Sequence, residues 1–200
     1  MKILFTTLLF LSNLLLFSQN SKLIKNPKKE NKLSIGVVGG NYTQVLELNG
    51  DHLANLNSYS ANISLDYFVS ENSYIKTGYQ GISTISFSGI SYDSYKLPLL
   101  LGHNFFSGKK YGSDISLQGE IGLYLRNITN FNNTSSITYT DNSVIGIQFS
   151  FNLRYDLSKK WFAIISLNSD RDFDDIITSQ DNTIKIENSY ALRLGFGFKF

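Results

Sequence analysis

Apolar residues alternate with small or polar residues over most of this chain, and this alternation constrains the fold more than any other feature. In the run 190–200, Phe, Leu or Tyr occupies every second position, and Ala, Arg, Gly or Lys lies between them. Successive side chains of a β-strand point to opposite faces, so this run predicts a strand with one wholly apolar face. We expect eight strands of about ten residues each, at 33–42, 59–69, 73–83, 95–106, 115–126, 145–156, 161–169 and 190–200.

The connections between these strands alternate in length. We expect short ones at 70–72, 107–111 and 157–160, and longer ones at 43–58, 84–94, 127–143 and 170–188. Outer-membrane barrels have short periplasmic turns at one end and longer external loops at the other. The pattern therefore predicts an all-β fold, an eight-stranded antiparallel up-and-down transmembrane β-barrel, with both the N- and the C-terminus on the periplasmic side.

A soluble β-sandwich or lipocalin-like barrel also alternates, but its apolar side chains fill the interior and its exterior is charged. Here only 17% of the residues are charged, and the polar face of the strands consists largely of Gly, Ser and Asn. Isolated charges of both signs suit a confined interior better than a water-exposed surface. Because an unpaired buried charge is destabilising, we expect an interior polar network of mutually paired charges, made of Asp66, Glu120, Arg154 and Arg193. A narrow polar path or a proton-linked role is the alternative for these residues.

Aromatic residues on the apolar face gather near the expected periplasmic ends of the strands. Membrane barrels carry girdles of aromatic side chains at the membrane–water interfaces. The residues expected to form this aromatic girdle are Tyr67, Phe105, Tyr155, Trp161 and Phe200. Together with the sparse charge, the girdle favours a membrane barrel over a soluble one.

The N-terminus has the order of a secretory signal peptide. Lys2 precedes an apolar run at 3–17 and polar residues follow it, so we expect residues 1–19 to be a signal peptide. A retained membrane anchor needs about 20 mostly apolar residues, and this run is shorter and interrupted. Residues 20–32 are predicted to be a basic periplasmic tail, either solvated or attracted to anionic phospholipid, and residues 33–200 the barrel. The predicted location is the outer membrane of a Gram-negative bacterium.

Three segments resemble the PorT-like outer-membrane β-barrel family. They are Tyr-Lys-Leu-Pro-Leu-Leu-Leu-Gly at 95–102, the glycine-spaced run at 119–125, and Leu-Gly-Phe-Gly-Phe-Lys-Phe at 194–200. The resemblance implies an eight-stranded outer-membrane barrel and little about activity; one branch of the family is associated with gliding and protein secretion, and no residue here selects it. It also implies that the terminal Phe200 is the assembly signal that the barrel-assembly machinery reads.

Composition and size exclude several functions. The chain has no cysteine, which excludes disulfides and cysteine-ligated metal sites, and a net charge of +2 does not indicate a nucleic-acid binder. Eight strands enclose an interior just wide enough for side chains to fill, which argues against a general porin. We expect no catalytic residue, no cofactor and no metal. The alternative is an outer-membrane lipid-modifying enzyme, for acyl transfer or deacylation, dependent on His52 or His103.

The longer connections are the remaining candidates for function. We expect a structural or binding role through these external loops, with outer-membrane lipid, a surface polymer or a partner protein as the contact. The connection 170–188 is rich in carboxylates and is predicted to be a solvated acidic loop, because it lacks the glycine and terminal glutamate of a calcium-binding loop. Its acidic residues are Asp170, Asp172, Asp174, Asp175, Asp181 and Glu187. Bridging to lipopolysaccharide through a divalent cation is a further hypothesis for this loop.

Overall fold

The structure of this 200-residue chain is a computed structural model. It describes residues 32–84, 90–107, 114–133, 140–141, 143–178 and 183–200. The predicted signal peptide at 1–19 and residues 20–31 of the predicted tail lie outside the described residues. Among the described residues, no helix is long and apolar enough to cross a membrane.

Eight long strands and two short ones make up the described structure. Their bounds are β1 Leu33–Leu48, β2 Asp51–Phe68, β3 Ser73–Thr84, β4 Ile90–Ser107, β5 Ile115–Asn133, β6 Thr140–Asp141, β7 Val144–Asp156, β8 Trp161–Asp172, β9 Ile177–Thr178 and β10 Thr183–Lys199. The long strands have 12 to 19 residues, which is longer than the alternation alone predicts.

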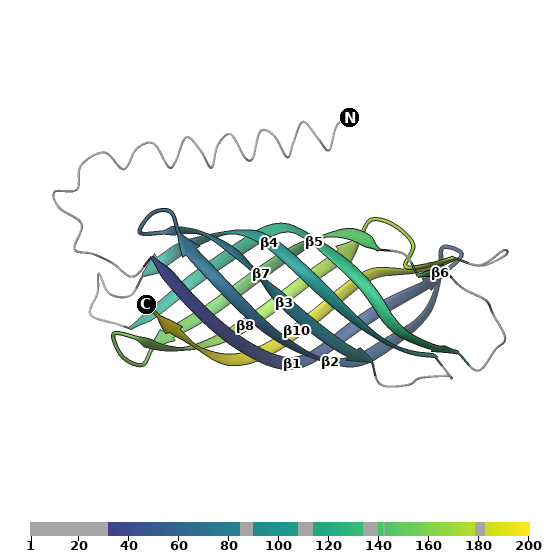
Figure 1. The fold of residues 1–200 in the computed structure, drawn as a ribbon, viewed down its shortest axis with the longest axis horizontal. Helices are drawn as coiled ribbons and strands as arrows, with labels where there is room; N and C mark the ends of the chain where they lie inside the picture. The colour runs from purple at the N-terminus through teal and green to yellow at the C-terminus, as the bar shows by residue number, and fades with distance from the viewer. Residues whose placement is uncertain (1–31, 85–89, 108–113, 134–139, 142, 179–182) are drawn as a thin grey trace, which may run out of the picture. The chain divides into compact units, whose positions relative to one another are not determined.

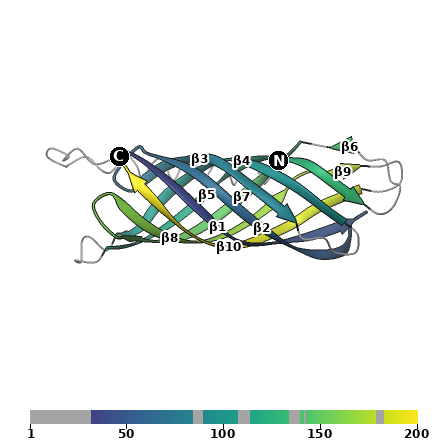
Figure 2. The ribbon, with the colours of Figure 1, turned by 60° about the horizontal axis from the view of Figure 1, so that its bottom comes forward.

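The long strands close into one barrel (Figures 1 and 2). They follow each other in the order β1-β2-β3-β4-β5-β7-β8-β10, and β10 pairs antiparallel with β1. The other neighbouring pairs are antiparallel as well. The closed eight-stranded antiparallel up-and-down barrel predicted from the alternation is therefore confirmed.

The two ends of the barrel differ. At one end, called here the C-terminal end, the Phe200 amide donates to the Leu33 carbonyl across 2.9 Å, and the tight connections at 69–72 and 157–160 lie there too. At the opposite end, called the hairpin end, β1 turns into β2, and the short strands β6 and β9 pair with each other beside β10 (Figure 1). The alternate connections therefore lie on opposite ends.

The predicted long connection at 43–58 is wrong. Strands β1 and β2 continue through it and are joined by a turn at Asn49 and Gly50, both with positive φ, 54° and 89°. Asn-Gly is the preferred pair for a two-residue hairpin turn in which both central residues have positive φ. The longer connections at 84–94, 127–143 and 170–188 are likewise shortened, because β4, β5, β8 and β10 extend into them.

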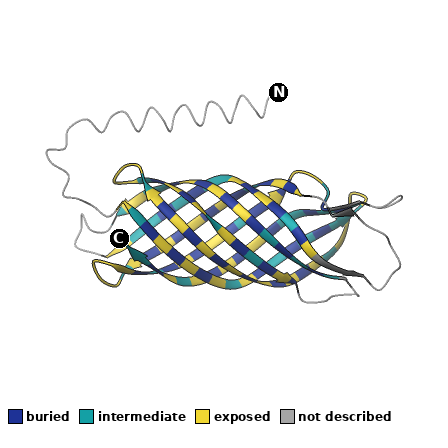
Figure 3. Cartoon of the chain, viewed as in Figure 1, coloured by how far each residue is buried: buried dark blue, intermediate teal, exposed yellow. Residues whose placement is uncertain are grey.

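Burial alternates along every long strand (Figure 3). Next to the C-terminal end the outward positions form an apolar band that encircles the barrel. Its exposed members include Val37, Ile63, Leu65, Leu97, Leu99, Leu101, Leu123, Phe149, Phe151, Ile165, Leu167, Leu192, Leu194 and Phe196. Among the described outward positions of this band there is no Asp, Glu, Lys or Arg.

Aromatic side chains border the apolar band on both sides. On the C-terminal side lie the five residues of the predicted girdle, each about half exposed or more. On the other side lie four tyrosines, called here the tyrosine ring, Tyr59, Tyr79, Tyr95 and Tyr190. The rings of Tyr79 and Tyr95 stack with centroids 5.6 Å apart. The sequence analysis identified only the first of these two borders.

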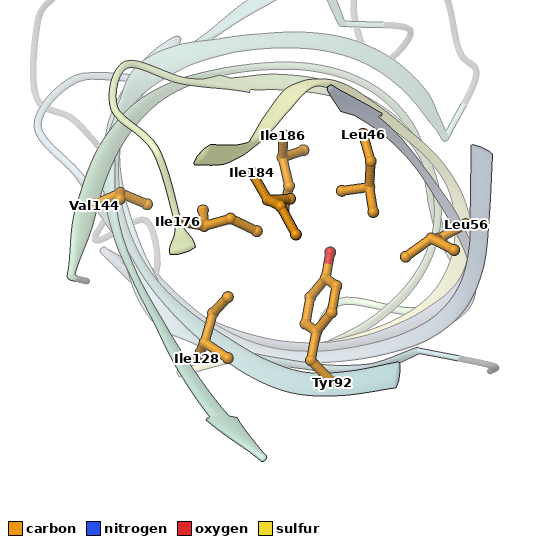
Figure 4. Close-up of a cluster of buried hydrophobic side chains, with 8 residues drawn as sticks. All are labelled: Leu46, Leu56, Tyr92, Ile128, Val144, Ile176, Ile184 and Ile186. Atoms are coloured by element: carbon orange, nitrogen blue, oxygen red, sulfur yellow. The ribbon is translucent and has the colours of Figure 1, made fainter. Parts of the chain in front are cut away.

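Beyond the tyrosine ring, at the hairpin end, the polarity of the barrel is reversed. The outward positions there are mostly polar, with Leu53 and Phe173 as exposed apolar exceptions. The inward positions carry a buried cluster, called here the apolar plug: Leu46, Leu56, Tyr92, Ile128, Val144, Ile176, Ile184 and Ile186. Figure 4 shows these side chains pointing toward one another inside the ring of strands.

A β-bulge in β10 helps to produce this reversal. Val45 pairs with Asn188 whereas Leu46 pairs with Ile186, so Glu187 is the extra residue. A bulge shifts the alternation by one residue. Ile186 therefore points into the barrel, although it has the same parity as the outward-facing Leu192 and Leu194.

Pro98 interrupts the pairing between β3 and β4, as its missing amide donor predicts. Thr77 pairs with Leu99 and Gln80 with Lys96, and the positions between them are unpaired in this ladder. The Thr77 hydroxyl donates to the Pro98 carbonyl across 2.9 Å. There is no register shift at this point, so Pro98 weakens the ladder locally without a bulge.

Candidate functional site

Two clusters of charged side chains occupy the interior behind the apolar band. The one nearer the C-terminal end, called here the lower network, is centred on Lys76, whose ammonium contacts Glu120 and lies 3.7 Å from the Asp66 carboxylate. The Tyr74 hydroxyl donates to Glu120 across 2.7 Å, and the Ser34 hydroxyl donates to Asp66 across 3.0 Å. The two carboxylates thus share one cation and two hydroxyl donors.

The lower network continues toward the C-terminal rim. Arg154 Nε lies 3.2 Å from the Asp156 carboxylate, and Lys199 Nζ lies 2.5 Å from the other oxygen of the same group. The Arg154 guanidinium also stacks on the Phe162 ring, 3.7 Å from its centroid, in a cation–π contact.

The second cluster, called here the upper network, lies directly below the apolar plug. Asp170 accepts from Lys96, from Arg126 Nη2 across 3.1 Å and from the Tyr42 hydroxyl across 2.6 Å. Asp172 accepts from the Tyr124 hydroxyl, and its other oxygen lies 3.3 Å from Arg126 Nη1. The side chains of all three ion pairs, Lys96–Asp170, Arg126–Asp170 and Arg126–Asp172, are fully buried.

Gln44 links the upper network to the apolar plug. Its side-chain oxygen accepts from Arg126 Nη1 across 3.2 Å and from the hydroxyl of Tyr92, a member of the plug, across 2.6 Å. Its amide nitrogen donates to the Ser58 hydroxyl across 2.8 Å. Side chains from strands on opposite sides of the barrel therefore meet at this level and fill the lumen.

The four predicted interior residues all point inward and are buried, but their contacts differ from the expected mutual pairing. Asp66 and Glu120 are brought together by Lys76, and Arg154 pairs with Asp156. Arg193 forms no ion pair with any described residue, and its Nε and Nη2 atoms have no hydrogen-bond partner among them. The charges that complete the network therefore come from residues that the sequence analysis did not single out.

Besides the half-buried Asp156 and Lys199 at the rim, five buried charged residues of the interior were not among the predicted ones. Strand parity was a signal for three of them, because Lys76, Lys96 and Arg126 fall on the same face as the polar residues of their strands. The other two, Asp170 and Asp172, were assigned to a solvated acidic loop, and that assignment is wrong. Strand β8 extends to Asp172, so both carboxylates lie in the interior, only 2% and 0% exposed.

The predicted girdle residues lie together at the C-terminal end. Trp161 packs edge-on against Phe198, and Phe198 packs edge-on against Phe200, with ring centroids 5.0 and 5.2 Å apart. Phe105 contacts His103 in the same manner at 5.4 Å. Tyr67 and Tyr155 are outward-facing and about half exposed.

The two histidines lie at opposite ends of the barrel. His52 is exposed on β2 at the hairpin end, and its Nε2 lies 3.2 Å from the Asn55 side-chain oxygen. His103 is half-buried at the level of the girdle, and its Nδ1 lies 3.0 Å from the Ser73 hydroxyl. Within the described residues, no group of three or more His, Asp or Glu side chains is placed to hold a metal ion.

A cavity of about 20 Å³ lies between the two networks. Its lining includes Lys76 and Glu120 from the lower network, the uncharged Asn62 and Gln148, and Arg193. A cavity of this size has room for one water molecule or one small ion.

Comparison with solved structures identifies the architecture. Neisserial surface protein A matches with a TM-score of 0.65 and 14% identity, over 84% of this chain and 97% of that one. The outer membrane protein OprG from Pseudomonas aeruginosa has a TM-score of 0.54 and 13% identity, over 86% and 97% of the two chains. The chain has the fold of the small outer-membrane barrels.

The N-terminal β-barrel domain of Pseudomonas aeruginosa OprF matches as well, with a TM-score of 0.51 and 17% identity over 86% of this chain and 98% of that one. No protein-family model and no curated protein sequence matches the chain. The likeness is therefore one of fold, and the role of the protein has to be argued from its own residues.

Proposed function

We propose that the protein is an outer-membrane barrel of a Gram-negative bacterium with a structural or binding role at its hairpin end. The observation that carries this proposal is the reversal of polarity along the barrel. Lipid requires apolar side chains outside, and a girdle at each interface, which is what the apolar band and its two aromatic borders provide. Water requires the opposite, which is what the polar exterior of the hairpin end provides.

The membrane location is tested by fractionation and by gel mobility. The protein expressed with its N-terminal segment should sediment with outer membranes, and unheated and boiled samples should migrate differently on a denaturing gel because the closed barrel resists the detergent. Recovery in the soluble periplasmic fraction, or identical migration of the two samples, would contradict the membrane assignment.

The proposed orientation places the hairpin end outside the cell and both termini in the periplasm. Support comes from the two short turns, which lie at the same end as Phe200. The chain has no cysteine, so a single Asp51→Cys or Lys159→Cys variant carries one label site, exposed at the hairpin end or in the 157–160 turn. A membrane-impermeant maleimide should label the first variant on intact cells and the second only after permeabilisation; the reverse pattern would overturn the orientation.

A general porin is not the proposed function, because side chains cross the lumen at two levels. The upper network and the apolar plug lie in series below and within the hairpin end. Vesicles containing the protein should therefore admit small sugars no faster than vesicles without it. Swelling at the rate of a porin would contradict this part of the proposal.

The binding role is assigned to the rim formed by the β1–β2 hairpin. Its residues Asp51, His52 and Leu53 are all exposed, and the two-residue turn presents them on paired strands. A variant with all three changed to alanine should lose a surface polymer or protein that co-purifies with the wild type from native membranes. The matched control changes Ser158, Lys159 and Lys160 in the opposite turn to alanine and should keep the partner.

Membership of the PorT-like family and recognition by the barrel-assembly machinery are also part of the proposal. They are supported by the quoted segments, which form parts of β4, β5 and β10. The Phe200 side chain is 55% exposed at the barrel rim, where an assembly factor has access to it. Phe200→Ser should lower the amount of heat-modifiable barrel in the outer membrane, while purified wild type and variant refold equally well in detergent.

A second candidate is lipid acyl transfer or deacylation at His103. The specific observation is its 3.0 Å contact with the Ser73 hydroxyl, a nucleophile and a base within hydrogen-bond reach. Replacing His103 by Ala should then change the acylation of membrane lipids measured by mass spectrometry, whereas His52→Ala should not. An unchanged lipid profile in the His103 variant removes this candidate.

A further inference from the structure

Within the described residues, the barrel interior contains one more cation than its carboxylates balance. The lower network has three acids and three bases, Asp66, Glu120, Asp156, Lys76, Arg154 and Lys199. The upper network has two of each, Asp170, Asp172, Lys96 and Arg126. Both networks are thus neutral when their groups are charged, and Arg193 belongs to neither.

Arg193 is buried and forms no ion pair with any described carboxylate. It is 1% exposed, and its Nε and Nη2 atoms have no hydrogen-bond partner among the described residues. Its cross-strand neighbours are Gly40 on β1 and Ser166 on β8, which are both uncharged. A Cβ atom at Gly40 would lie 2.1 Å from the Leu192 carbonyl oxygen, so the two strand backbones approach closely there, and glycine provides no acceptor side chain for the guanidinium.

The chemistry of arginine makes this arrangement informative. A buried lysine is able to lose its proton and become neutral, whereas a guanidinium stays charged in proteins. An unpaired buried charge is strongly destabilising. The charge of Arg193 therefore calls for an anion from solution, or for water, at a place that its guanidinium reaches.

The cavity between the two networks is such a place. Arg193 is part of its lining, together with the hydroxyl and amide side chains of Ser64, Ser166 and Asn168. The carboxylates of Asp66 and Glu120 also line it, but both are paired with Lys76. A volume of about 20 Å³ admits a monatomic ion and excludes larger anions.

We propose that the barrel binds one chloride-sized monovalent anion in this cavity, against the Arg193 guanidinium. The anion neutralises the interior and stabilises the closed barrel. This site is independent of the proposed function at the hairpin end, since it concerns only the barrel interior behind the apolar band.

Thermal unfolding of the purified barrel in detergent tests the proposal. At constant ionic strength, replacing sodium gluconate by sodium chloride should raise the midpoint of the heat-induced mobility shift in a saturable way, by roughly 3–5 °C at a tenfold excess over Kd. Gluconate is too large for the cavity. Arg193→Met and Arg193→Gln should both lose this chloride dependence, since neither keeps the charge.

Arg154→Gln is the matched control, because it removes a buried cation that has its own carboxylate partner, Asp156. It should lower the midpoint and keep the chloride dependence. If the Arg193 variants fail to fold, anomalous diffraction from wild-type crystals grown in sodium bromide decides, with one bromide peak expected beside the guanidinium. The proposal would be overturned if the unfolding midpoint of the wild type did not change with chloride, or if the midpoint of Arg193→Met still did. The absence of a bromide peak in the cavity would overturn it as well.

Discussion

The same strands form two regions of this barrel in which the distribution of apolar and polar side chains between outside and inside is opposite. Between the girdle and the tyrosine ring, apolar side chains such as Leu99 face outward, and charged groups such as Asp170 face inward. Beyond the tyrosine ring, polar residues such as Asn57 face outward, and aliphatic ones such as Ile186 face inward. Each strand thus behaves as a membrane strand over part of its length and as a strand of a soluble barrel over the rest.

The difference shows which interactions stabilise each region of the folded barrel. In the proposed membrane location, lipid solvates the exterior of the apolar band, so the stability of this region depends on satisfying the interior charges with partners. At the hairpin end, water solvates the exterior, so stability depends on burying aliphatic surface in the plug. The tyrosine ring lies at the boundary between the region stabilised by paired interior charges and the region stabilised by buried aliphatic side chains.

The largest expected effect is on the interior of the band. Asp170→Asn removes the carboxylate shared by Lys96, Arg126 and the Tyr42 hydroxyl, and it should lower the free energy of unfolding by about 3–5 kcal/mol. Urea unfolding followed by the fluorescence of Trp161, the only tryptophan, measures this. Asp174→Asn, at an exposed position just beyond β8, is the control and should change stability little.

The interior of the hairpin end should respond to the loss of volume instead of charge. Ile186 is fully buried in the plug, and Ile186→Ala should lower the free energy of unfolding by about 2–5 kcal/mol. Its control is Val37→Ala, which removes methyl groups from the exposed face of the band. An equal loss in both variants, measured by the same urea titration, would mean that the plug is not a core.

The two exteriors are compared directly by placing the same charge on each. Leu99→Arg, in the middle of the apolar band and 62% exposed, should destabilise the barrel in lipid vesicles by about 2–4 kcal/mol. Asn55→Arg lies beyond the tyrosine ring and should be nearly neutral. Refolding into vesicles and urea titration measure both, and similar losses for the two variants would move the membrane boundary away from the tyrosine ring.

The smallest expected effect concerns the tip of the hairpin end. Gly50 has a φ of 89° and open space around the position of a Cβ atom, so Gly50→Ala introduces backbone strain alone. The expected loss is roughly 1–2 kcal/mol. Asn55→Ala, on the paired part of the same hairpin, is the control, and a larger loss there than at Gly50 would show that the turn does not set the register.

Several charged residues of the two interior networks could be predicted from the sequence. The alternation alone places Lys76, Lys96 and Arg126 on the inward face of their strands. The inward facing of Asp170 and Asp172 could not be predicted, because the apolar alternation of β8 ends near Leu167. Beyond that residue the outward face of the strand changes from apolar to polar. A pattern that relies on an apolar outward face stops at the tyrosine ring, although the strand continues.

The hairpin end was mispredicted for the same physical reason. The Asn49-Gly50 pair is a local hairpin signal, but the mixed polarity of the segments on either side of it favours a loop. Ile184 and Ile186 have the parity of lipid-facing residues, and only the bulge at Glu187 turns them inward. A bulge is set by pairing between strands and leaves no periodic trace in one strand.

By itself the sequence determined the number and direction of the long strands and, within the apolar band, which residues face outward. The reason is that a period of two is a property of each strand alone and the apolar residues mark one of its faces. Only the tertiary structure decided which inward charges meet, since Lys76, Glu120 and Asp66 lie on three different strands. It also decided that the barrel extends past its apolar band around the apolar plug, and that no carboxylate of the described residues pairs with Arg193. Contacts across the lumen depend on the stagger between strands, which no single strand encodes.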